Sequence, residues 1–287
     1  MNAIPANTAG VKELIILTPP QKDGTIKPEI VIAADLCNIN QIYKVGGAQA
    51  IAACAYGTET IPAVYKVVGP GNIYVALAKK ALDGFIGIDM VAGPSEVAIL
   101  ADEEANPDYI ALDLMSQAEH DEKARANMFT DSITLAEKVN KALNKLIKTM
   151  SREAIIKKAL INYGAIIVTS SKEEAINWIN QMAPEHCEIM TTSARKDSEA
   201  IKQAGAIFIG AYTPEAVGDY FAGTNHTLPT SRTARFSSGL STLDFIKKTS
   251  VVYYDQETLT KNANSIYNLA QTEGLQAHAE NIAIRKK

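Results

Sequence analysis

The sequence predicts an α/β protein with two Rossmann-like parallel-sheet units, one of them incomplete, and a helical C-terminal arm. Residues 1–93 alternate short β-rich runs with runs of helical periodicity, and residues 94–240 repeat this alternation. Such alternation favours parallel sheets with helices on their faces. Residues 241–287 are helical in pattern and end in basic residues, so we expect them to form a separate dimerisation arm.

The first unit combines short strands with glycine-rich turns. We expect strands at residues 12–18, 41–45, 63–68 and 87–91, and helices at residues 28–38, 48–56 and 72–82. Ligands of open parallel sheets bind beyond the carboxyl ends of the strands, and a following helix N-terminus offers free N–H groups to phosphate. A nucleotide site is therefore one interpretation of these turns. The other is a simple turn, because Gly69-Pro70-Gly71 belongs to no GxGxxG fingerprint.

The second unit has longer elements. We expect strands at residues 96–101, 126–130, 165–169, 188–191 and 206–210, and helices at residues 107–120, 133–150, 152–160, 172–182 and 195–203. The helix at 107–120 is the best marked, because Asn106 is a favoured N-cap residue and Pro107 suits the first helical position. Its apolar residues recur at helical spacing and predict a buried stripe of Ala111, Leu114, Met115 and Ala118.

Composition excludes some classes of partner. The 287-residue chain has a formal net charge of −4, which gives no electrostatic reason to expect nucleic acid or an anionic membrane. Its longest apolar runs are too short to cross a bilayer, and the N-terminus carries no signal segment. The three cysteines, Cys37, Cys54 and Cys187, fit reduced thiols. We therefore expect a cytoplasmic protein.

Each of the four histidines lies in a polar cluster. The clusters are Gln117-x-x-His120, Glu185-His186, Asp219 with Asn225-His226, and Glu273 with His278. Four scattered histidines on a solvated surface would not be expected to share such surroundings. One polar site that draws on all four segments explains them together.

A metal ion is one possible occupant of that site. Gln117 and His120 are three residues apart, so they share a face near the end of a helix. With Asp219 and His278 they make a nitrogen and oxygen donor set that suits Zn²⁺ or a similar divalent ion. The alternative is that His120 is a solvated residue at the C-terminal end of the helix dipole.

Proton transfer is the second chemistry of the site. Glu185 and His186 place a carboxylate and an imidazole in one loop, and these are the side chains best suited to acid–base work near neutral pH. Adjacent residues point apart, so each would serve a different proton. The alternative is an exposed loop in which Glu185 is solvated.

Several motifs, in order along the chain, resemble those of histidinol dehydrogenases. They are VGGAQAIAA (45–53), VVGPGN (67–72), IDMVAGPSEV (88–97), DLMSQAEHD (113–121), PEH (184–186), GDYFAGTNHTLPT (218–230) and EGLQAHAENIAIR (273–285). The resemblance implies an NAD-dependent, zinc-containing homodimer. It also implies oxidation of L-histidinol to L-histidine, the last steps of histidine biosynthesis, in two steps through an aldehyde with two NAD⁺.

The same resemblance implies a role for each matching residue. The zinc ligands would be Gln117, His120, Asp219 and His278. The proton acceptors would be Glu185 and His186. The substrate contacts would be Ser95, Gln117, His120, His186, Asp219, His226, Glu273 and His278, and the NAD contacts would be Gln49 and Asn72. The C-terminal arm, with Glu273 and His278, would cross to the partner subunit.

The resemblance departs from the family at the start of the chain. Residues 1–5 look like the middle of a family helix, and the preceding part, with half of one α/β domain, has no counterpart. We therefore expect an unpaired edge or an uncovered apolar face in the second unit. Two alternative functions follow: an inactive, truncated remnant that binds zinc and dimerises, or a zinc hydrolase in which Glu185 activates water.

Overall fold

The computed structural model describes residues 1–286. The chain forms two compact units, Met1–Ile246 and Lys247–Lys287, which from here on are called the first and the second unit in place of the predicted ones. Every strand of the described residues belongs to the first. None of the described helices is long and apolar enough to span a bilayer. The predicted boundaries at residues 93 and 240 stay predictions.

A five-stranded parallel sheet forms the centre of the first unit. Its order is β7-β6-β5-β8-β9, and each neighbouring pair runs parallel. The strands are β5 (Glu96–Ala101), β6 (Arg125–Thr130), β7 (Ala165–Val168), β8 (His186–Met190) and β9 (Ala206–Ile209). The α/β fold class is confirmed, and β8 begins two residues before its predicted start, so that it includes His186.

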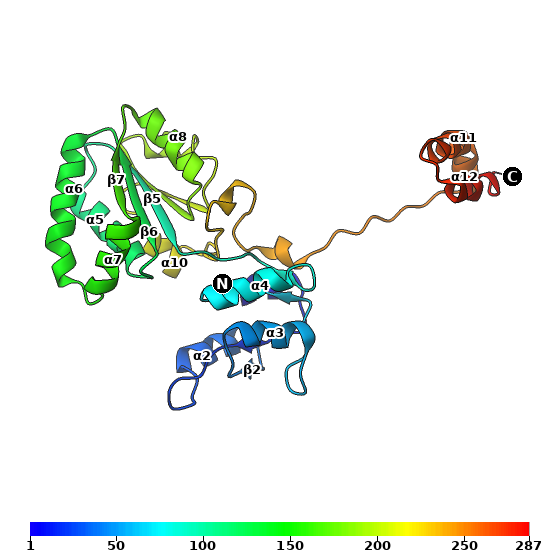
Figure 1. Ribbon diagram of the computed structural model, residues 1–287, viewed down its shortest axis with the longest axis horizontal. Coiled ribbons are helices and arrows are strands. Elements are labelled where there is room, and N and C mark those ends of the chain that lie inside the picture. The colour runs from blue at the N-terminus through cyan, green and yellow to red at the C-terminus, as the bar shows by residue number, and fades with distance from the viewer. Residues whose placement is uncertain (287) are drawn as a thin grey trace. The chain divides into compact units, whose positions relative to one another are not determined.

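Helices cover both faces of this sheet (Figure 1). On one face, Val97 and Ile99 of β5 pack with residues of α5 (Pro107–Ala118) and α6 (Ile133–Leu146). On the other face, the alternating residues of β5 pack with α8 (Lys172–Met182) and the region of α9 (Ala194–Ser198). Because β5 is buried on both faces, it reads as a continuous apolar run, as central parallel strands do.

Helix α5 is capped and buried as its sequence predicts. The Asn106 side chain accepts hydrogen bonds from the N–H groups of Asp108 (2.9 Å) and Tyr109 (3.4 Å). The predicted stripe is fully buried. The helix ends at Ala118, two residues before its predicted end, so Gln117 lies in its last turn and His120 lies just beyond it.

The first 95 residues contain strand pairs instead of one continuous sheet. Strand β1 (Ile16–Leu17) pairs with β2 (Ile42–Tyr43), and β3 (Lys66–Val67) pairs with β4 (Gly87–Ile88). Both pairs are parallel, as the alternation predicts, but each has only two residues in register, so the strands are shorter than predicted and form two separate pairs.

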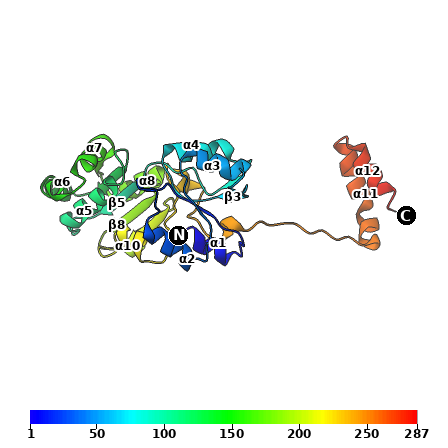
Figure 2. The ribbon, with the colours of Figure 1, turned by 90° about the horizontal axis from the view of Figure 1, so that it is seen from below.

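The helices of this region are α1 (Ala3–Thr8), α2 (Pro28–Leu36), α3 (Ala48–Tyr56) and α4 (Ile73–Leu82). Helices α3 and α4 lie side by side (Figures 1 and 2).

A buried ion pair organises the turn at Gly69. The ammonium of Lys79 on α4 pairs with Asp89, and both side chains are almost fully buried. Lys79 Nζ also donates to the Gly69 carbonyl (2.9 Å), and the Gly69 N–H donates to Asp89 Oδ2 (2.7 Å). The Gly69-Pro70-Gly71 turn is therefore held from both sides by charged groups.

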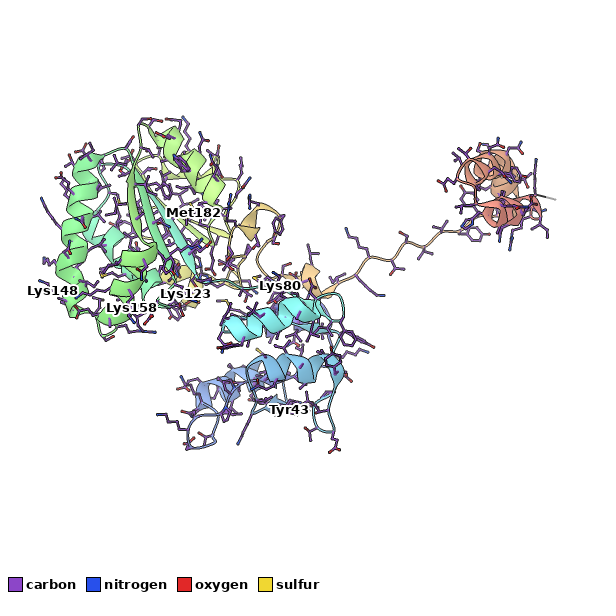
Figure 3. All side chains as sticks on the ribbon, viewed as in Figure 1. Tyr43, Lys80, Lys123, Lys148, Lys158 and Met182 are labelled. Carbon is purple, nitrogen blue, oxygen red and sulfur yellow. The ribbon has the colours of Figure 1, made fainter. Side chains whose placement is uncertain are left out.

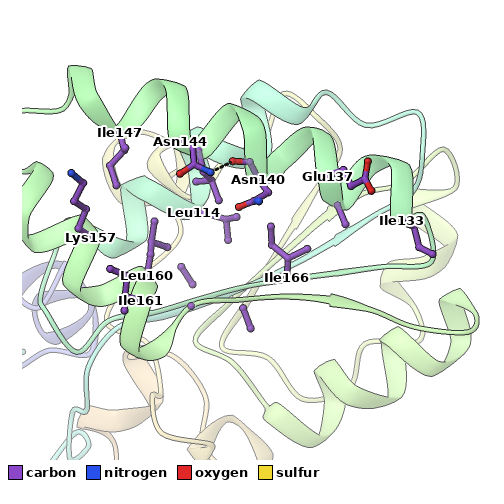
Figure 4. Close-up of a pocket in the computed structure, with 15 residues that line it drawn as sticks. Leu114, Ile133, Glu137, Asn140, Asn144, Ile147, Lys157, Leu160, Ile161 and Ile166 are labelled. Carbon is purple, nitrogen blue, oxygen red and sulfur yellow. Dashed lines mark hydrogen bonds between the residues drawn. The ribbon is translucent and has the colours of Figure 1, made fainter.

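The central sheet has two open edges. Strands β7 and β9 are paired on one side only, and Val168, Ile207 and Ile209 are more than a third exposed. Any open sheet has two such edges, so the prediction of an edge left by absent strands stays a prediction. An apolar cavity of about 600 Å³ lies beside β7, between α6 and α7 (Glu153–Tyr163) (Figure 4). Lys148 and Lys158 lie on the solvent side of this helical layer (Figure 3).

The second unit is a helical hairpin. It consists of α11 (Gln256–Thr272) and α12 (Gln276–Ala283), and Gly274 between them has φ +74°. A hollow of about 640 Å³ lies between the two helices and is lined by both Glu273 and His278. Two of the predicted site residues therefore share one surface of this unit.

Candidate functional site

The start of β8 positions Glu185 and His186 against β5. His186 is in register with Val97, beside Glu96 at the start of β5. The Glu96 N–H donates to Glu185 Oε2 (3.1 Å), and the Glu96 carbonyl lies 3.1 Å from His186 Nδ1. One residue of the neighbouring strand thus fixes both side chains, and both are buried, at 8% and 2% exposed.

The surroundings of His186 determine which ring nitrogen carries the proton. Nδ1 faces two oxygen acceptors, the Glu96 carbonyl and Gln117 Oε1 at 2.9 Å. It must therefore be the N–H of the neutral ring, which leaves the lone pair on Nε2. That Nε2 faces His226 Nε2 at 2.9 Å, and the two rings stack with centroids 4.7 Å apart. His226 accordingly donates its Nε2–H to the lone pair of His186 Nε2.

Glu215 lies beside the two histidines. The sequence did not predict it as a site residue. It begins the short helix α10 (Glu215–Tyr220), and its N–H donates to Glu188 Oε1 (2.7 Å). Its Oε2 lies 3.7 Å from His186 Nδ1, and its Oε1 lies 4.0 Å from His226 Nε2. The available signal was spacing: Glu215 is four residues before Asp219, so on a helix the two carboxyls share a face.

Gly218 lets α10 approach the histidines closely. A Cβ added there would lie 2.5 Å from the Phe208 ring and 3.4 Å from His226 Nδ1. Any larger residue would push α10 away from β9 and from His226. The predicted irregular segment therefore begins after α10, and Asp219 lies within that helix.

Burial and crowding of the carboxyls shift their protonation. Burial, and then the charges of Glu215, Glu96 and Asp219, raise the pKa of Glu185 to about 8. Burial, and then Asp219 and Asp113, raise the pKa of Glu215 to about 8. Ion pairs among the described residues join neither Glu185 nor Glu215 to a lysine or arginine. A bound cation would therefore favour the ionised form of both groups.

The pKa values of the two histidines are shifted downward. Burial, and then the charges of His226 and His120, lower the pKa of His186 to about 3. Burial is also the main cause that lowers the pKa of His226, opposed by the charge of Asp219. Both rings are therefore neutral, which is the form that accepts a proton or ligates a metal.

The predicted residues of the first unit gather around this group. Gln117 is fully buried and touches His186. Asp219 is half-buried and His120 is exposed, and both act electrostatically on His226. Ser95 immediately precedes β5 and is half-buried.

The two predicted NAD contacts lie elsewhere in the first unit. Asn72 is the N-cap of α4, and its Oδ1 accepts from the N–H groups of Tyr74 (3.1 Å) and Val75 (3.2 Å). Gln49 is in the first turn of α3, and its side chain folds over Gly47, where an added Cβ would lie 2.8 Å from Gln49 Oε1. Each residue therefore shapes a helix N-terminus after a glycine turn.

Glu273 and His278 belong to the second unit, at the end of α11 and within α12. Their part in the site stays a prediction.

The donor atoms fit a cation. His186, Glu215 and His226 each offer one ligand atom within 4.8 Å of the others. Gln117 Nε2 and Glu215 Oε2 are buried without a hydrogen-bond partner. This group differs from the ligand set that the sequence resemblance implies, but both sets combine imidazole nitrogen with carbonyl or carboxylate oxygen, as Zn²⁺ sites do.

Comparison with known proteins decides the family. The family model described as histidinol dehydrogenase matches residues 1–286. The chain belongs to the histidinol dehydrogenase family. This confirms the resemblance drawn from the motifs.

Curated members of the family are similar over the full chain. Histidinol dehydrogenases from Clostridium acetobutylicum and Bacillus subtilis are each 53% identical over 287 residues, which are 100% of this chain and 67% of each relative. The chain superposes on the crystal structure of histidinol dehydrogenase from Elizabethkingia anophelis with a TM-score of 0.93 and 39% sequence identity. The match covers 99% of this chain and 66% of the crystallised one. The chain thus spans about two thirds of the length of these relatives.

Proposed function

We propose that the chain oxidises L-histidinol to L-histidine with NAD⁺, in two steps through the bound aldehyde. The observation that carries this proposal is the pair Glu185 and His186 in a buried site, with the basic Nε2 of His186 directed at His226. Family membership supplies the substrate class. The pair supplies one base for the hydroxyl protons of both halves and a second base for the water that attacks the aldehyde.

His186 would act on the hydroxyl of the substrate. Its Nδ1–H is held by the Glu96 carbonyl and Gln117, so Nε2 has a fixed direction. It would take the hydroxyl proton as the carbon loses hydride. The same nitrogen would take the second hydroxyl proton once the aldehyde is hydrated.

Glu185 would act on water. The Glu96 N–H fixes one carboxyl oxygen at 3.1 Å and leaves the other available. Because burial raises the pKa of Glu185 to about 8, its carboxylate is a stronger base than an exposed one. It would remove a proton from the water that attacks the aldehyde carbon. A buried site also keeps the aldehyde from bulk solvent between the two steps.

Gln117, His120, Asp219 and His278 would hold the zinc ion, with one ion per subunit. Bound zinc would supply a fixed positive centre that orients the imidazole and amine of the substrate. The proximity of His186, Glu215 and His226 favours a second ligand set as the alternative.

NAD would lie beside the turns that carry Gln49 and Asn72, where two helices begin. Bound NAD⁺ would accept the hydride at each step. We also propose a cytoplasmic homodimer in which the C-terminal unit of one subunit brings Glu273 and His278 to the site of the other.

NADH formation tests the proposal. The purified chain, supplied with zinc, NAD⁺ and L-histidinol, should form two molecules of NADH for each molecule of histidine. A zinc hydrolase or an inactive remnant would form no NADH with histidinol, and would therefore contradict the proposal. A variant that lacks His186 serves as the blank for background reduction.

A further inference from the structure

We propose that Glu215 is a further substrate-binding residue, whose carboxyl accepts N–H hydrogen bonds from the amino group of an amino-alcohol substrate. This inference rests on the proposed function and deepens it. It explains a buried glutamate that the roles above do not use.

The Glu215 carboxyl is directed into the site without a partner. The side chain is 6% exposed, and Oε2 is buried with no hydrogen bond. A buried carboxyl oxygen without a donor is destabilising unless a ligand supplies one. The two histidine rings do not supply one, because they are 3.7 and 4.0 Å away, beyond hydrogen-bond distance.

The backbone of Glu215 is held from the opposite side. Its N–H donates to Glu188 Oε1 on β8 (2.7 Å), and Glu188 is 1% exposed. Because β8 also carries His186, one strand fixes both the base and the start of α10. The distance between the two side chains is therefore set by rigid structure.

The position of Glu215 matches the geometry of a vicinal amino alcohol. In a staggered N–C–C–O chain with gauche geometry, the amine nitrogen lies about 3 Å from the hydroxyl oxygen. A hydroxyl at His186 Nε2 therefore places the amine within a few ångströms of that nitrogen. The Glu215 carboxyl lies beside the same two rings: Oε2 is 3.7 Å from His186 Nδ1, and Oε1 is 4.0 Å from His226 Nε2, which itself lies 2.9 Å from His186 Nε2.

The other carboxyls of the site differ from Glu215 in their surroundings. Glu96 Oε2 and Glu188 Oε2 are also buried without a partner, but among the described residues it is Glu215 that shares a ligand cluster with His186 and His226. Glu185 already accepts from the Glu96 N–H, and Glu188 accepts from the Glu215 N–H. Asp219 belongs to the proposed zinc set. Glu215 is thus the carboxyl beside both histidine rings, and an amine is the one group of histidinol that a plain imidazolyl alcohol lacks.

Calorimetric binding of two ligands tests the inference. The zinc-loaded wild-type chain is titrated with L-histidinol and with 3-(imidazol-4-yl)propan-1-ol, which lacks only the amine. We expect wild type to bind histidinol roughly ten- to a hundredfold more tightly, the scale of a hydrogen bond to a charged group. In Glu215→Gln and Glu215→Met this preference should fall to a few-fold, with little change in binding of the deamino analogue.

Glu188→Gln is the matched control. It changes a buried glutamate that contacts the Glu215 backbone and is not part of the cluster of His186, Glu215 and His226. We expect a lower melting temperature and an unchanged preference for the amine. Zinc content is measured for every variant, because a metal-ligand role for Glu215 would show as lost zinc.

Three outcomes decide between the inferences. If both Glu215 variants weaken the two ligands equally, or lose zinc, the amine-binding role is overturned while the proposed function stands. If wild type binds no histidinol, the proposed function fails and takes this inference with it. Selective loss of the amine preference, with zinc retained, supports the role of Glu215.

Discussion

Glu185 and His186 are neighbours in sequence, and the proposed function gives them separate tasks. Both are fixed by Glu96, yet one faces carboxyls and the other faces His226. We expect His186→Asn to slow both half-reactions roughly 10²–10⁴-fold, because each needs a proton taken from an oxygen. Glu185→Gln should slow mainly aldehyde oxidation, the half that needs an activated water.

Supplying histidinal directly separates these effects. Steady-state rates are compared for histidinol and histidinal in each variant. Equal losses on both substrates in Glu185→Gln would refute its assigned role. Thermal melts of the two variants serve as the control, because a folding defect would lower both rates together with stability.

Metal content tells the two candidate ligand sets apart. We expect His120→Ala or Asp219→Ala to abolish stoichiometric zinc in elemental analysis, because each removes one ligand of the proposed set. His226→Ala should retain zinc. The reverse pattern would assign the ion to the group of His186, Glu215 and His226.

The sequence predicted site residues where a local pattern carries chemistry. The pairs Gln117-x-x-His120 and Glu185-His186 were visible because their spacing is short. Glu215 was not, because its importance comes from β8 and α10 being brought together in space. Contacts of that kind depend on tertiary structure, which one sequence does not contain.

Among the elements, α4 shows how one buried pair supports a turn. Lys79→Met would leave the Asp89 carboxylate buried without its cation and remove the bond to the Gly69 carbonyl. We expect a loss of about 3–5 kcal/mol in the free energy of unfolding, the range for one partner of a buried pair. NAD affinity should fall as well, because the turn leads to Asn72.

A double variant controls for lost packing. Lys79→Met with Asp89→Asn removes both charges and keeps an acceptor for the Gly69 N–H. Urea unfolding should show it to be more stable than Lys79→Met alone. If the double variant is the less stable of the two, the ion pair is not the source of the effect.

Element prediction was accurate where helices have caps and strands are buried. Helix α8 begins and ends where predicted, with Ser171 as its N-cap. The first strands were overestimated, because residues such as 12–18 have β-forming composition but only Ile16 and Leu17 pair. Strand length depends on a partner strand, and local composition does not reveal how many residues find one.

At the scale of the whole molecule, the proposed dimer can be tested by mixing inactive chains. If His278 reaches the site of the partner subunit, a chain with His120→Ala and a chain with His278→Ala can form a heterodimer with one intact site. Random pairing then restores about a quarter of the wild-type zinc and activity. Neither variant alone should bind zinc or show activity.

Refolding the two variants together from denaturant ensures exchange of subunits. A mixture that stays without zinc would mean that both residues act within one chain, whereas zinc retained by the His278→Ala chain alone would mean that His278 is no ligand. Wild type refolded with either single variant gives the reference for recovery.

The two-residue strands near the start of the chain have a consequence for amide hydrogen exchange. Each pair holds few ladder bonds, whereas β5 is buried on both faces and paired on both sides. Deuterium should therefore enter residues 11–95 early and β5 last. If NAD binds to residues 11–95, it must slow deuterium uptake there. Its affinity would then include the entropy cost of ordering these residues. Deuterium uptake by β5 and β8 should not change when NAD binds.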